Sequence, residues 1–134
     1  TAMTPVGIFM GCFYTDPTTS QPTWNQMWPT GTVATDAMAF VLDDPDAVFR
    51  MQANASLAQT TLGNNIAVTQ TSGSTTIMRS KNSVTASSAA TTNTLPLRIL
   101  EFVNGPDSAV GDAYTDVLLT YVAGMHQYRT ALGV

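Results

Sequence analysis

Charged side chains are scarce in this sequence. Only 10% of the 134 residues are Asp, Glu, Lys or Arg, against roughly 25% in an ordinary soluble domain. Threonine alone outnumbers all the charged residues together. We therefore expect a surface of Thr, Ser, Asn and Gln. A net charge of only −4 offers little electrostatic resistance to association between copies, so large permanent interfaces are expected.

Positive charge is the rarest kind and is dispersed along the chain. The five cations are Arg50, Arg79, Lys81, Arg98 and Arg129. Binding to nucleic acid needs clustered cations, because affinity comes from displacing counterions along the phosphate backbone. The sequence therefore excludes DNA and RNA as direct partners.

Cysteine and long hydrophobic runs are also missing. Cys12 is the only cysteine, which excludes an intrachain disulfide and a zinc cluster and favours a buried apolar thiol. No stretch approaches the ~18 consecutive apolar residues of a membrane span, and residues 1–5 do not begin a signal peptide. The sequence thus indicates neither a membrane nor a secretory route.

Side chains suited to catalysis are few. His126 is the only histidine and Glu101 the only glutamate, and neither a nucleophile elbow nor a zinc helix motif occurs. We expect His126 to serve packing or an interface, and Glu101 to pair with Arg98 or to reach across an interface. The prediction is a protein that is not an enzyme and has no cofactor, with a small hydrolase based on His126 and an aspartate as a remote alternative.

Three aspartates cluster at Asp43, Asp44 and Asp46. Carboxylates in a turn can bind a hard cation such as Ca²⁺, but the glycine and terminal glutamate of an EF-hand loop are missing. A solvated hairpin turn is the preferred interpretation, so no metal site is predicted. Asp107, Asp112 and Asp116 are interpreted as loop and edge polarity.

Apolar residues make up 44% of the chain, enough for one core, so we predict a single domain over residues 1–134. Strand-like segments recur at roughly 10-residue spacing with turn signals between them, which is typical of an all-β, mainly β sandwich or small barrel. The predicted strands cover residues 6–14 with a bulge near Gly11, and residues 23–28, 35–42, 47–52, 66–70, 77–79, 95–103 and 110–122.

Three further predictions concern how these segments connect. Residues 47–52 are expected to form a hairpin with residues 35–42, and residues 56–62 to form the one short helix, capped by Asn54 or Ser56. Residues 80–94 are small and polar, and they are expected to form a long surface loop or arm that serves an interface.

Aromatic residues gather near the start of the chain, where Phe13 and Tyr14 precede Trp24 and Trp28. Core or interface packing is the preferred interpretation, because interfaces are enriched in Trp and Tyr. The alternative is a sugar pocket, which would make the protein a carbohydrate-binding or host-adsorbing component of a virion head fibre.

Several motifs together resemble a family of small virion structural proteins of tailed bacteriophages, especially marine short-tailed ones. The similarity lies in residues 89–107, 110–116 and 126–128, and in residues 28–36, 43–46 with Phe49 and Gln52, and 62–65. It thus runs over nearly the whole chain.

The resemblance implies a capsid decoration, or cement, protein of the outer capsid surface, made in the host bacterial cytoplasm. Its partners would be the major capsid protein and further copies of itself, as a trimer by preference or a dimer. Residues expected at interfaces are Trp24, Trp28, Arg98, Glu101, His126, Tyr128 and Arg129, together with residues 80–94 and the tail 126–134. Members of this family carry further sequence before the first strand, so an upstream N-terminal segment is also expected.

Overall fold

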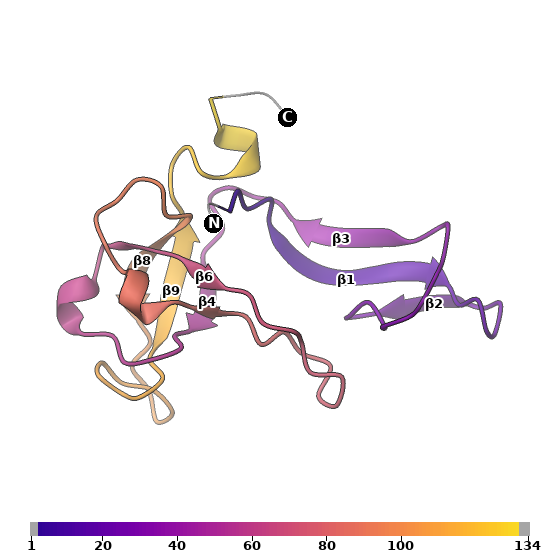
Figure 1. Ribbon diagram of the computed structural model, residues 1–134, viewed down its shortest axis with the longest axis horizontal. Coiled ribbons are helices and arrows are strands. Elements are labelled where there is room, and N and C mark those ends of the chain that lie inside the picture. Colours follow the sequence, from indigo (N-terminus) through magenta and orange to yellow (C-terminus); the bar gives the residue numbers. More distant parts are fainter. Residues whose placement is uncertain (1–2, 132–134) are drawn as a thin grey trace.

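The computed structural model describes residues 3–131 and contains nine strands and three short 3-10 turns over that range. Its two parts are a rounded body and a three-stranded sheet that projects from it (Figure 1). The prediction of a mainly β fold is confirmed, with three antiparallel sheets that are consistent with a small sandwich and do not close into a barrel within the described range.

The projecting sheet, here called the arm, comprises residues 8–42. Its strands are β1 (Ile8–Thr15), β2 (Pro22–Asn25) and β3 (Met38–Leu42), in the order β2-β1-β3. The predicted bulge is confirmed, because the pairing of β1 with β3 shifts register between Phe9 and Gly11. Gly11 has φ +147, and a Cβ there would lie 2.6 Å from Cζ2 of Trp24, so both the backbone angle and the indole ring require glycine.

The body comprises residues 47–131 and holds the main core. One sheet has the order β4-β9-β8-β5, from β4 (Phe49–Gln52), β9 (Asp116–Tyr121), β8 (Leu97–Phe102) and β5 (Asn65–Ile66). A second pairs β6 (Val68–Thr69) with β7 (Ser83–Val84). The core between them is fully buried; its most enclosed members are Ile66, Val84, Ile99, Val117 and Leu119.

The predicted hairpin between residues 35–42 and 47–52 is wrong. β3 pairs with β1, whereas β4 pairs with β9 in the other sheet. The acidic segment between them, residues 43–46, is therefore the crossing from the arm to the body. A local turn signal marks where a strand ends, but the partner of each strand is chosen by long-range packing.

The predicted helix at residues 56–62 is also wrong, and only the 3-10 turn η1 (Gln59–Thr61) forms there. The expected capping side chains are occupied by distant parts of the chain. Asn54 Oδ1 accepts a hydrogen bond from the Ala86 amide at 2.9 Å, and Ser56 Oγ donates to the Gly111 carbonyl at 2.9 Å. Because Leu57 is drawn into the core, these tertiary contacts hold the segment extended.

The polar segment 80–94 is not a free loop, which corrects a third prediction. Val84 within it is completely buried, and the segment forms β7 and the 3-10 turn η2 (Ala86–Ser88). Ser88 Oγ accepts a hydrogen bond from the Ala67 amide at 2.9 Å, and Ala90 pairs with Asn65. Residues 77–79, predicted to be a strand, instead belong to a turn closed by the Ser74–Arg79 bridge.

Candidate functional site

The arm has two unlike faces. Directly opposed residues of antiparallel strands share a face, and the register places Phe13 opposite Trp24 and Met38, and Gly11 opposite Phe40. We call this side the open face; its side chains are Ile8, Phe13, Trp24, Met38, Phe40 and Leu42. These side chains are all apolar, and the apolar stretch ends at Thr15, whose hydroxyl donates to Asp36 Oδ2 at 2.6 Å.

The opposite side is partly covered by the arm's own loop. Cys12 Sγ lies 3.5 Å from the carbonyl oxygens of Asn25 and Met27, and the Tyr14 ring lies 5.1 Å from the Trp28 ring. Cys12 and Tyr14 are consequently buried, which confirms the expected buried thiol. The arm thus has a small core on one side and none on the other.

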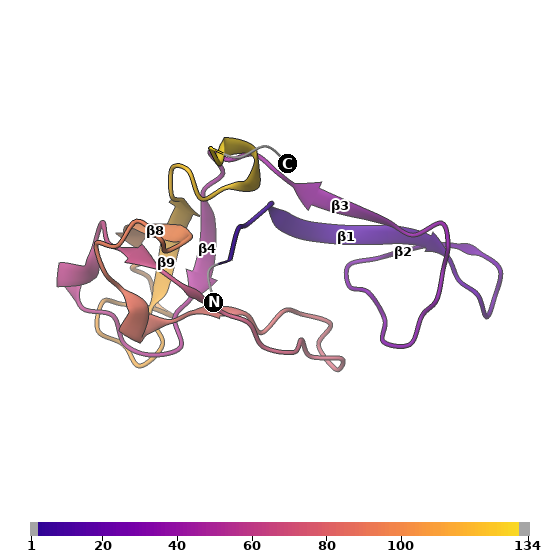
Figure 2. The ribbon, with the colours of Figure 1, turned by 45° about the horizontal axis from the view of Figure 1, so that its top comes forward.

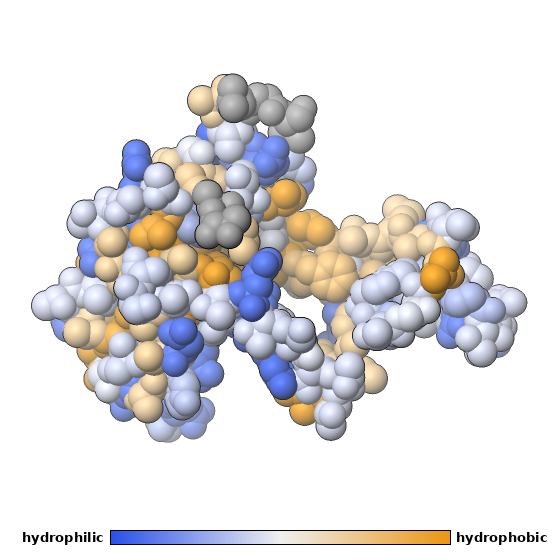
Figure 3. Space-filling model, viewed as in Figure 1, coloured by the Kyte–Doolittle hydropathy of each residue, from blue (hydrophilic) through white to orange (hydrophobic). Residues whose placement is uncertain are grey.

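The open face exposes an unusual amount of apolar surface. Phe13, Trp24, Met38, Phe40 and Leu42 retain between 40% and 63% of their accessible surface. Large side chains carry about 150–250 Å² each, so roughly 500 Å² of apolar surface is uncovered. Figure 3 shows apolar residues continuing along the arm from the place where it leaves the body. A patch of this size in a soluble protein is typical of an interaction site.

The two tryptophans predicted as interface residues lie on opposite faces of the arm. Trp24 is on the open face, over Gly11, while Trp28 packs against Tyr14 on the covered face. They do not form one aromatic platform, because the sheet lies between them.

The tail residues predicted at an interface fasten the arm to the body. The Gln127 amide donates to the Pro5 carbonyl at 2.9 Å, just before β1, and Arg129 forms an ion pair with Asp46 at 2.8 Å, just after β3. Both belong to the 3-10 turn η3 (Gln127–Arg129). The turn therefore contacts both chain segments that lead into the arm. Residues 132–134 of the predicted tail interface lie outside the described residues.

His126 supports this turn from inside. It is 1% exposed and packs between Tyr121 and Tyr128, at ring distances of 4.8 and 5.5 Å. Its Nδ1 accepts a hydrogen bond from the Tyr128 amide at 3.2 Å, and its Nε2 has no partner among residues 3–131. The His126 side chain is thus enclosed, whereas the ring of Tyr128 is exposed.

The outer face of the body sheet carries most of the remaining predicted residues. Arg98 and Glu101 share this face because the register shift at Leu100 turns both outward. The expected Arg98–Glu101 pair is not formed: Arg98 Nε donates to Asn65 Oδ1 at 3.0 Å, and neither residue is in an ion pair of the described chain.

Sequence reasoning missed the ion pair between Arg50 and Asp116 on that same face. Arg50 Nε donates to Asp116 Oδ2 at 3.0 Å, and its Nη2 contacts the same oxygen. Asp116 is buried, with Oδ1 unpartnered within the described residues, so it is not the loop polarity that was predicted. A signal existed, because an aspartate directly before the apolar run 117–119 lies at the start of a strand.

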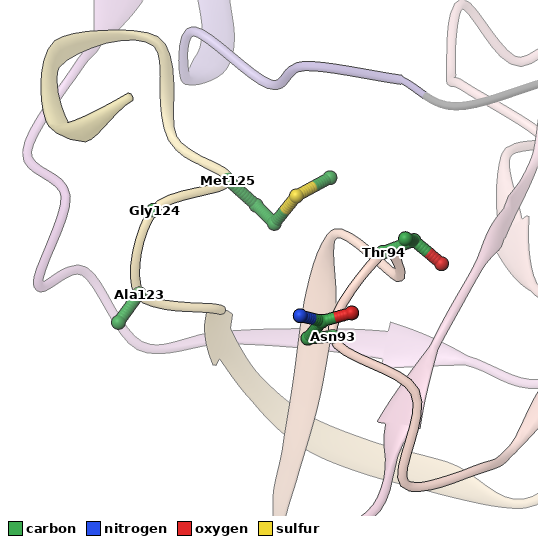
Figure 4. A pocket seen from close by; sticks show the side chains of 5 residues that line it. All are labelled: Asn93, Thr94, Ala123, Gly124 and Met125. Carbon is green, nitrogen blue, oxygen red and sulfur yellow. The ribbon is translucent and has the colours of Figure 1, made fainter. Parts of the chain in front are cut away.

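Other features are weaker candidates for a site. A shallow hollow of about 460 Å³ is lined by Asn93, Thr94, Ala123, Gly124 and Met125, and no charged side chain converges on it (Figure 4). Residues 3–131 contain no group of three potential metal ligands and no helix long and apolar enough to cross a bilayer. The open face of the arm is therefore the strongest candidate site.

Comparisons with protein-family models, with curated proteins and with solved structures found no match to this chain.

Proposed function

We propose that this protein is a capsid decoration, or cement, protein of a tailed bacteriophage. In this role it binds the outer surface of the expanded icosahedral shell, contacts the major capsid protein and neighbouring copies of itself, and braces adjacent capsomers. The role is structural rather than enzymatic. The proposal is supported by the motifs that resemble small virion proteins, and by the exposed apolar face of the arm, which could bind a neighbouring subunit.

One observation carries the proposal. The body completes its own core, with five apolar side chains at 0% exposure, while the arm extends away from it and leaves about 500 Å² of apolar surface uncovered on one face. A subunit built in this way is stable by itself but gains further free energy from a neighbour. That is what a protein added to a finished shell requires.

The scarcity of charge supports the same role. Apolar and hydroxyl-rich contacts depend little on ionic strength, whereas charged contacts are screened. Weak individual contacts are sufficient, because binding only to the assembled shell stabilises that shell by mass action, and many copies act together.

The test is co-sedimentation of the purified protein with expanded capsids stripped of it, with unexpanded procapsids as the control. Saturable binding to expanded shells alone is the expected result, and the plateau gives the copy number. Absence of binding to either shell contradicts the cement role. Glycan binding that is lost in Trp24→Ala would instead favour the host-adsorbing function.

A further inference from the structure

A second projection leaves the body on the same side as the arm. Residues 70–82, here called the finger, connect β6 to β7, and in both ribbon views the finger and the arm are separate (Figures 1 and 2). The finger is closed by the Ser74 amide bonded to the Arg79 carbonyl at 2.9 Å, and by the Thr71 amide bonded to Asn82 Oδ1 at 3.0 Å.

The finger carries apolar and basic side chains in sequence. Ile77 and Met78 are 61% and 49% exposed, and Arg79 and Lys81 follow them. Neither cation takes part in an ion pair within residues 3–131, where the described pairs are those of Arg50 and Arg129. The finger therefore presents an uncovered apolar tip beside two uncompensated positive charges.

The edges of the arm sheet differ in how they are protected. β2 begins with Pro22 and alternates polar Thr23 and Asn25 with Trp24, features that discourage pairing with another strand. β3 is the other edge, and its five residues, Met-Ala-Phe-Val-Leu, contain no charge, proline or polar side chain, yet all are exposed. An apolar run on both faces is typical of an internal strand. β3 is therefore suited to become internal when a second chain covers it.

Charge at the ends of β3 disfavours the two registers in which the apolar runs of two β3 strands overlap completely. Antiparallel pairing centred on Phe40 puts Asp36 of one copy opposite Asp44 of the other, twice. Parallel pairing in register puts Asp43 beside its own counterpart. Like charges directly opposite each other destabilise a sheet, so the occupant that suits β3 is apolar with basic flanks.

The finger has both apolar and basic side chains, and they follow one another in the same order along the chain as the apolar and acidic residues of β3. Apolar residues come first and charged residues follow in both segments: Ile77 and Met78 before Arg79 and Lys81, and residues 38–42 before Asp43 and Asp44. Residues 75–78 form a turn, with Met78 at φ 51, so this turn would lie against β3 rather than pair with it as a strand, with apolar side chains together and the cations within reach of the carboxylates.

We propose that β3 of one copy binds the finger of a second copy, with Ile77 and Met78 against the apolar strand and Arg79 and Lys81 beside Asp43 and Asp44. The contact is head-to-tail, because the two copies use different surfaces. Such contacts close into a ring when the rotation between copies allows it, and a ring of three is the oligomer preferred from the sequence. The inference deepens the proposed cement role, but it is measured on the purified protein without capsids, so each can fail separately.

Charge reversal and mixing test the contact. The arm variant carries Asp43→Lys with Asp44→Lys, and the finger variant carries Arg79→Glu with Lys81→Glu. Each alone is expected to weaken self-association by about ten-fold or more at low salt, measured by sedimentation velocity. The variant with all four changes is expected to associate again. Asp107→Lys, a reversal on an exposed loop of the body that changes the net charge in the same direction as the arm variant, is the control for that variant, and circular dichroism confirms that each variant is folded.

Mixing separates a head-to-tail contact from pairing of identical surfaces. In a mixture, the tagged arm variant is expected to capture the finger variant, because its lysines meet the introduced glutamates, while neither variant captures its own kind. Normal self-association of the finger variant, or failure of the four-site variant to recover, overturns the proposal. A wild-type protein that is monomeric at all concentrations also overturns it, whatever the result with capsids.

Discussion

Replacing Phe40 with serine should separate the role of the arm from that of the core. Phe40 lies on the open face and is 48% exposed, which leaves about 100 Å² of its surface uncovered. If a neighbour covers that area, its loss costs about 2.5 kcal/mol of association free energy at ~25 cal/mol per Å². The dissociation constant of the self-assembled protein should then rise by about 60-fold.

The matched control is Leu119→Ala, a truncation in the body. Leu119 is fully buried in the main core, where such a change lowers the free energy of unfolding by about 2–5 kcal/mol. Urea unfolding followed by circular dichroism should show a large loss for Leu119→Ala and a small one for Phe40→Ser. Sedimentation velocity should show the reverse order for association.

Two outcomes would refute this reasoning. If Phe40→Ser destabilises the body as much as Leu119→Ala does, the arm is part of the folding core rather than an interface. If Phe40→Ser leaves association unchanged, the open face is not what neighbours contact.

Three further predictions concern the arm root, the pH dependence and the body. Arg129→Ala should speed proteolysis within residues 43–48 while lowering the free energy of unfolding by less than about 1 kcal/mol, because its ion pair with Asp46 is exposed; unchanged cleavage would contradict this. Hydrogen bonds from the side chain and then the backbone of Thr15 lower the pKa of Asp36 below 3.8, so their stabilisation is present above pH 3.8 and lost as the pH falls through the lowered value. The Thr15 amide resonance should report this acid transition, and Asp36→Asn should abolish it. Val84→Asp should unfold the body, since an aspartate would be buried there without a partner; a folded variant would show that residues 80–94 are a free loop after all.

Prediction from the sequence succeeded best for strands that pair with the next strand along the chain. The strand predicted at residues 95–103 corresponds to β8, and residues 110–122 contain β9; these two consecutive strands pair with each other, joined by residues 103–115. The bulge near Gly11 was also predictable, because glycine in an aromatic strand marks a place where the backbone must bend or be approached closely.

The failures share a physical cause. Asn54 and Ser56 have the chemistry of helix caps, but they bond to Ala86 and Gly111, which are distant in sequence. The neighbours of Val84 in the sequence are small and polar, yet its side chain is completely buried in the apolar core. Local propensity is worth less than about 1 kcal/mol per residue, so a few long-range contacts outweigh it.

The sequence did not predict the arm, because an apolar residue can be buried either by its own chain or by a neighbouring one, and the pattern is the same in both cases. Residues 38–42 have the pattern of a strand buried on both faces, and the strand predicted at residues 35–42 was accordingly given a partner within the same chain, residues 47–52. In the single chain the same residues form an exposed edge. The apolar pattern of β3 and its exposure in the single chain are reconciled if the sequence was selected in an assembled state, in which a neighbouring chain covers β3. Amide hydrogen exchange can test this explanation. Protection of the amides of residues 38–42 from exchange should rise steeply with protein concentration, while protection of residues 117–119 should not change.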